Sequence, residues 1–132
     1  MVVVASLMVA MGAAMAVLGG TSAMGVLNDR IDPTFWGDTA VTGPAADYRA
    51  WLFAVLGGTM AGWSAGMIVM IRRGIAHGVR WAWNAVALGL LIWYPIDTGY
   101  SLAHQVWINA IGNTVILALM AVPLAATRGA TK

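Results

Sequence analysis

The chain lacks cysteine and glutamate altogether, and it carries few charges of either sign. Without cysteine it can form no disulfide, no thiolate nucleophile and no cysteine-ligated zinc or iron–sulfur site. Charged residues make up 9% of the 132 residues, whereas soluble domains carry about 25%. The net charge of +2 is too small to indicate nucleic-acid binding.

Apolar side chains are what the sequence has in abundance. They make up 61% of the chain, which is more than a soluble domain of this length can bury. Its apolar segments predict transmembrane helices at about residues 2–20, 48–72, 80–100 and 105–126. We therefore expect an all-α fold, a bundle of four transmembrane helices in one membrane domain of residues 1–132. The rival interpretation of the first segment, a cleaved signal peptide, lacks the basic start that such peptides have.

The second predicted helix is the expected centre of the bundle. Trp51–Ile71 contains no charge and, as a helix, is about 30 Å long, the thickness of the hydrocarbon layer. Small residues recur in it at every fourth position, at Ala54, Gly58, Gly62 and Gly66. Such a stripe lets a neighbouring helix approach closely in lipid, so we predict it as the packing face. Gly12, Ala16 and Gly20 of the first helix offer it a similar face.

Basic residues predict how the bundle is oriented. Four spans place five of the seven bases on one side, namely Arg72, Arg73, Arg80, Arg128 and Lys132. Arg30 and Arg49 fall on the other side with four aspartates. Because cytoplasmic loops are enriched in Lys and Arg, both termini are predicted to be cytoplasmic, in the inner membrane of a bacterium.

The loop between the first and second spans is then periplasmic. Asp32-Pro33 reads as the cap and first turn of a short interfacial helix, with Phe35 and Trp36 as its membrane anchors. Gly43-Pro44 predicts the start of the second span. The loop aspartates do not have the spacing of a calcium-binding EF-hand, which favours a solvated loop.

Polar residues interrupt the apolar pattern near the outer ends of the third and fourth spans. If the helix continues past Pro95, residues at offsets of three, four and seven from Asp97 share its face. The predicted cluster comprises Asp97, Tyr100, Ser101, His104, Asn109 and Asn113, with Arg49 as the cationic partner of Asp97. Two interpretations stay open: hydrogen bonds that hold two helices together, or an outer pocket that binds a small ligand or relays a proton.

Chemical motifs are otherwise absent from the sequence. His77 and His104 fall on opposite sides of the membrane, which argues against a bis-histidine haem, and no HExxH or GxSxG motif occurs. We predict no cofactor, metal or catalytic residue. The favoured function is a non-catalytic interaction protein, either an accessory subunit of a membrane assembly or a self-associating chain, in contact with membrane lipids. The alternatives are small-molecule binding or transport through the outer pocket, and an enzyme acting on a lipid or quinone.

Three segments carry a resemblance to a known group of proteins. They are GGTMAGW (Gly57–Trp63), RRGIAHGVRWAW (Arg72–Trp83) and WYPIDTGYSLAHQVWINAIGNTVIL (Trp93–Leu117). In this pattern a GxxxAGW segment precedes a basic turn, a WAW start, an Asp followed by Thr or Ser, and an NxxxNT segment. The sequence resembles a family of small uncharacterised bacterial membrane proteins, and the resemblance implies a four-helix inner-membrane protein without assigning an activity.

Overall fold

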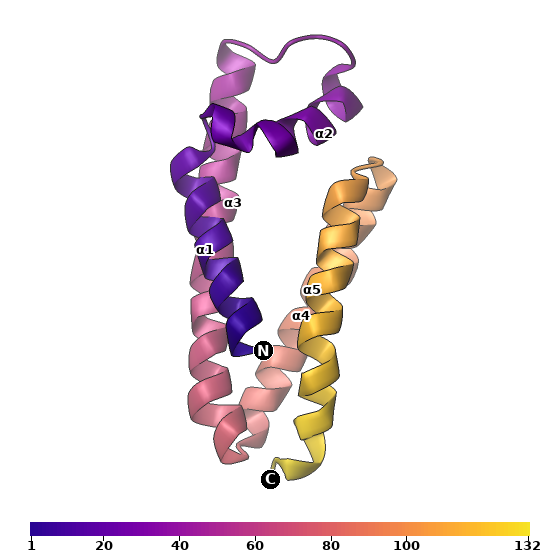
Figure 1. Cartoon of the computed structure of the whole chain (residues 1–132). Coiled ribbons are helices and arrows are strands. Elements are labelled where there is room, and N and C mark those ends of the chain that lie inside the picture. Colours follow the sequence, from indigo (N-terminus) through magenta and orange to yellow (C-terminus); the bar gives the residue numbers. More distant parts are fainter. The chain divides into compact units, whose positions relative to one another are not determined.

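The computed structural model describes all 132 residues and is all-α, with five α-helices and no strand, as the composition predicted. The helices are α1 (Val2–Leu18), α2 (Gly25–Trp36), α3 (Pro44–Val69), α4 (Arg80–Ala103) and α5 (Trp107–Thr127) (Figure 1). The four predicted spans correspond to α1, α3, α4 and α5, and the boundaries differ by a few residues. The periplasmic loop of the prediction contains the remaining helix, α2.

Two helical segments, Pro44–His77 and Trp107–Ala130, are long and apolar enough to cross a membrane. Helix α1 is apolar but has 17 residues, and α4 does not meet the same criterion. The apolar run of α4 is interrupted by Asn84, Pro95 and Asp97. The structure therefore supports two of the four predicted spans by length and composition, and the other two remain a prediction.

Helix α3 starts where the sequence predicts, and the winding of the chain changes directly after its last residue, Val69. It begins at Pro44, whose missing N–H costs nothing in a first turn. Past Val69 the chain continues through a wider π-helical turn, Met70–Gly74, and a 3₁₀ turn, Ile75–His77. A side chain on Gly74 would collide with the Cβ atom of Ala82, so this glycine allows the turn to pack directly on α4.

Three prolines lie inside helices, namely Pro33, Pro95 and Pro123. The prediction that a helix starts at Asp32-Pro33 is wrong, because α2 begins at Gly25 and Pro33 lies in its last turn. At this position the proline still accepts a backbone bond, from the Gly37 N–H at 3.1 Å, and its lost N–H affects one bond near the helix end. Pro95 does not end α4, which continues to Ala103 and so keeps Asp97 and Ser101 on one helical face.

The chain divides into two compact units, which are described separately. The N-terminal unit is Met8–Trp63, and the C-terminal unit is Ser64–Lys132 together with Met1–Leu7. In the N-terminal unit α1 lies along α3 (Figure 1), with two glycines facing each other. A Cβ atom on Gly12 would lie 2.5 Å from the Gly57 carbonyl oxygen, and one on Gly57 would lie 2.7 Å from the Ala16 nitrogen. The two backbones are therefore in direct contact, as in small-residue crossings of membrane helices.

The face of α1 that makes this contact is the predicted one, but the predicted face of α3 is not. Gly58, Gly62 and Gly66 have open space where a Cβ atom would stand, whereas Gly57 is buried against α1. Helix α3 also repeats small residues at Gly57 and Ala61, one position away from the predicted stripe. One residue rotates a helix face by about 100°, so α1 uses this second stripe and leaves the first open.

In the C-terminal unit α4 and α5 lie side by side, with Val86, Leu90 and Met120 buried. The Trp83 indole Nε1 donates to the Leu124 carbonyl oxygen at 2.8 Å. The last residue is tied to the turn before α4: the Lys132 N–H donates to Gly78 O at 2.8 Å, and the Arg80 N–H donates to Lys132 O at 3.1 Å. These bonds fix the end of the chain beside the start of α4.

Candidate functional site

The densest polar contact in the chain centres on the Asp97 carboxylate, at the far end of the C-terminal unit from Lys132. Its Oδ1 atom accepts hydrogen bonds from the side-chain amides of two asparagines on α5, Asn109 at 2.6 Å and Asn113 at 2.9 Å. Its Oδ2 atom accepts a bond from the Trp93 indole at 3.0 Å, one helical turn earlier on α4. Donors from both helices of the pair thus converge on one acidic group.

Two hydroxyl groups extend these contacts. Ser101 donates to the Asp97 backbone oxygen at 2.7 Å and accepts from Asn109 at 2.8 Å. The Thr98 hydroxyl accepts from Asn113 at 3.3 Å. Thr98, Ser101 and Asn113 are all buried, so their polar atoms depend on these protein bonds rather than on bulk water. We refer to these six residues as the Asp97 network: Trp93, Asp97, Thr98, Ser101, Asn109 and Asn113.

The structure brings together four of the residues singled out in the sequence, Asp97, Ser101, Asn109 and Asn113. Tyr100 points elsewhere: it is 70% exposed and stacks on His104, with ring centroids 6.4 Å apart. His104 caps the C-terminus of α4 and lies beyond its last helical residue. Because α4 ends at Ala103, the helical spacing that predicted His104 on the face of Asp97 does not apply to His104.

Arg49 has a different partner from the one expected. Its guanidinium pairs with Asp32, which joins α3 to α2 within the N-terminal unit, and this corrects the assignment of Arg49 to Asp97. The Nε atom of Arg49 is buried and has no hydrogen-bond partner. The side-chain oxygen of Asn28, one turn before Asp32 on α2, is also buried and has no hydrogen-bond partner. Arg49 therefore binds Asp32 of helix α2, which belongs to the same unit.

Two members of the network were missed in the sequence. Trp93 is four residues before Asp97, so helical spacing alone placed it on the same face. Thr98 directly follows Asp97, a position about 100° around the helix, and no spacing rule connects it to Asn113.

The geometry of the network suits helix pairing better than catalysis. A carboxylate has about four acceptor positions, and here two amides and a weak contact from the Ser101 hydroxyl at 3.4 Å meet Oδ1, while the Trp93 indole meets Oδ2. The Asp97 network thus uses most of its hydrogen-bonding capacity within the α4–α5 pair. No group of three or more His, Cys, Asp or Glu residues in the chain is placed to hold a metal ion.

Fold and network together define a helical protein with two candidate membrane-spanning helices and a buried polar contact between its last two helices. No family model, curated protein or solved structure matches the chain.

Proposed function

We propose that the chain is a four-span protein of the bacterial inner membrane that acts by packing against other membrane helices, as an accessory subunit or by self-association, rather than by catalysis. Both termini are cytoplasmic in this proposal. The resemblance to small bacterial membrane proteins points the same way.

Exposure of the apolar helices supports a membrane location. A core helix of a soluble protein passes the same length and hydropathy criterion, but it is mostly buried. In both candidate spans 22% of the most apolar window is buried. Large side chains such as Val69, Ile111 and Val122 are more than half exposed. An exposed apolar surface that continues along two whole helices is expected of a protein whose solvent is lipid.

Helix α4 fits a span because three of its polar side chains bond within the pair that it forms with α5, while Asn84 near its start is exposed. Asp97, Thr98 and Ser101 bond to α5 or to α4 itself. The exposed positions of α4 include Leu88 and Leu91, which are apolar. Polar groups that meet a partner helix, with apolar groups toward lipid, are the arrangement that membrane helices use.

The open stripe on α3 is the observation that carries the proposed role. One small-residue face of α3 is filled by α1 through Gly12 and Gly57. The second face, Gly58, Gly62 and Gly66, has the same spacing, and each of these glycines has open space where a Cβ atom would stand. In lipid, helices associate through close backbone contact at such faces, so this stripe can accept another helix.

Cross-linking in the native membrane, followed by native mass spectrometry in mild detergent, tests the role. We expect a complex with another copy or another subunit, and we expect Gly62→Leu to disrupt it because leucine fills the stripe. Gly99→Leu is the matched control, since Gly99 is an exposed helical glycine on α4 with open space around it. A lone wild-type chain, or equal loss in both variants, would contradict the proposal.

The Asp97 network supports a structural role within this function. Its bonds run between α4 and α5, and each hydrogen bond between membrane helices contributes about 0.6 kcal/mol on average. Small-molecule binding or transport through this cluster would instead require groups that stay available to a ligand. A ligand-induced thermal shift that disappears in both Asp97→Asn and Asn113→Leu would support that alternative.

A further inference from the structure

Positive charge is concentrated where α4 begins and the chain ends. Five of the seven bases lie there, all in the C-terminal unit: Arg72, Arg73, Arg80, Arg128 and Lys132. None of them has a carboxylate partner, because the single ion pair of the chain joins Arg49 to Asp32. Asp97, the one acid of this unit, is 17 residues beyond Arg80, roughly 25 Å along the helix. We call these five residues the basic end.

Specific contacts hold part of the basic end in place. The Arg80 guanidinium donates to the Thr131 carbonyl oxygen at 3.0 Å. The Arg128 guanidinium lies over the Trp83 ring, 5.6 Å from its centroid. Backbone bonds from Lys132 to the turn before α4 keep the last residues close to both. These contacts hold the charges of two chain segments together, the start of α4 and the last residues, although like charges repel one another.

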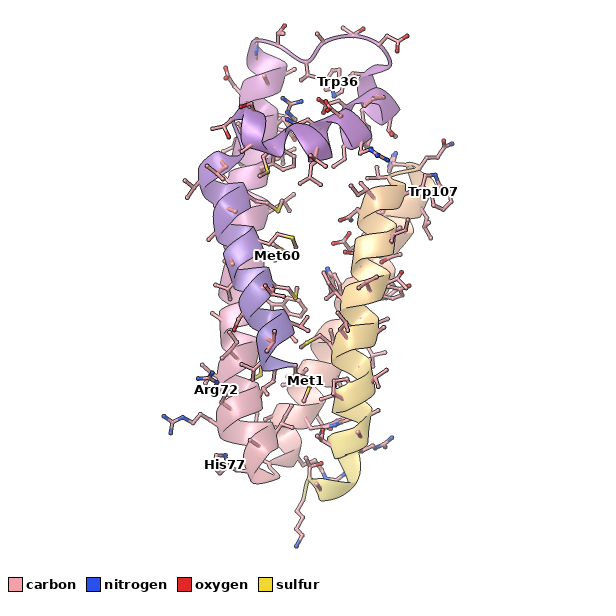
Figure 2. The ribbon with its side chains drawn as sticks, in the orientation of Figure 1. Met1, Trp36, Met60, Arg72, His77 and Trp107 are labelled. Carbon is pink, nitrogen blue, oxygen red and sulfur yellow. The ribbon has the colours of Figure 1, made fainter.

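Arg72 and Arg73 are the two arginines of the basic end whose side chains contact no other group of the protein. Both lie in the π-helical turn, whose wider winding buries Ile71 and Gly74 and leaves the two arginines exposed. Neither side chain forms a hydrogen bond, ion pair or ring contact. Figure 2 shows Arg72 extending away from the ribbon. Each guanidinium therefore presents its five N–H donors to the surroundings.

Exposed apolar side chains lie next to the charged groups of the basic end. Val69 and Trp81 next to it are 60% and 65% exposed. Trp is enriched where the hydrocarbon layer meets the headgroups, and guanidinium groups bind phosphate oxygens in a bidentate manner. A phospholipid brings a phosphate and acyl chains to this boundary together.

We propose that the basic end binds the phosphate groups of anionic phospholipids at the cytoplasmic surface of the bilayer, with Arg72 and Arg73 as the principal contacts. The inference rests on the proposed membrane location but not on the proposed packing role. It assigns the basic residues a lipid class in addition to their effect on orientation.

The test uses the full-length chain in nanodiscs made from equal amounts of phosphatidylcholine and phosphatidylglycerol. Native mass spectrometry of the released protein then gives the ratio of the two lipids that it retains. We expect phosphatidylglycerol to be enriched in the wild type. Arg72→Gln and Arg73→Gln should each lower the enrichment by up to about fivefold, which corresponds to about 1 kcal/mol per basic residue near an anionic surface.

Two further variants separate phosphate binding from charge alone. Arg30→Gln removes the same charge from α2, in the N-terminal unit, and should leave the enrichment unchanged. Arg72→Lys keeps the charge but loses the bidentate geometry, and it should fall between the wild type and Arg72→Gln. Equal retention of both lipids by the wild type, or an equal loss in Arg30→Gln, overturns the inference while leaving the membrane location intact. A chain that does not enter nanodiscs at all overturns the membrane location and the inference with it.

Discussion

The contact between α1 and α3 makes a sharp prediction, because two adjacent glycines on α3 differ in their surroundings. Gly57 is pressed against α1, and Gly58 faces open space. Alanine at position 57 would place its Cβ atom 2.7 Å from the Ala16 nitrogen and 2.9 Å from the Met15 Cβ atom. Ordinary contacts of a Cβ atom are 3.4–4 Å, so the helices must separate by about 1 Å.

Both variants gain the same intrinsic helix propensity, about 1 kcal/mol for alanine over glycine. Gly58→Ala should therefore be neutral or slightly more stable than the wild type. Overpacking of a close contact costs about 1–3 kcal/mol, which opposes that gain in Gly57→Ala. The difference between the two variants, in which the propensity gain cancels, should be about 1–3 kcal/mol.

Unfolding by sodium dodecyl sulfate in mild detergent, followed by circular dichroism and tryptophan fluorescence, measures this difference. Gly12→Ala should behave like Gly57→Ala, and the double variant should cost less than the sum, since one separation of the helices relieves both clashes. Equal unfolding midpoints for Gly57→Ala and Gly58→Ala would refute the close packing of α1 on α3.

Three further variants test the C-terminal unit by thermal unfolding in detergent. Asn113→Leu should destabilise the α4–α5 pair by about 1–3 kcal/mol, because it removes a donor from the buried side of Asp97; a midpoint equal to that of the wild type would contradict this. Trp83→Phe keeps an aromatic side chain but loses the five-membered ring of the indole and its bond to an α5 carbonyl oxygen, which should cost at least about 1 kcal/mol, whereas Trp81→Phe, at a largely exposed ring, serves as the control. Tyr100→Phe should change stability by less than about 0.5 kcal/mol, since the side chain is mostly exposed, and a larger loss would show that Tyr100 contributes to the Asp97 network.

Periodicity in the sequence predicted the helices well because each long helix is marked by an apolar run and by Pro, Gly or basic residues at its ends. It could not choose between the two small stripes of α3. Both repeat every fourth residue, and the rotation of α3 depends on bulky neighbours such as Phe53, which is buried. On α1 the choice was simpler, because Gly12 and Ala16 offer the smallest surface there, and the structure uses it.

Within the polar cluster, spacing succeeded where the helix is regular and failed near its end. Ser101 and Asn113 follow from four-residue offsets on α4 and α5. His104 does not, because α4 ends at Ala103 and the next residue leaves the helical path. Arg49 was assigned by its predicted side of the membrane, whereas Asp32 is its actual partner. Charge alone does not specify which of several acids a base will meet.

In the proposed four-span arrangement, the convergence of α5 amides on Asp97 affects how the chain enters the bilayer during synthesis. An isolated α4 would carry an uncompensated carboxylate near its outer end, and its insertion would cost up to about 2.5–3.5 kcal/mol, the cost of a charge at the helix centre. Asn113 follows 16 residues later and supplies the missing donor. Helix α4 should therefore wait at the translocon until α5 has emerged from the ribosome, and the two should pass into lipid as one hairpin.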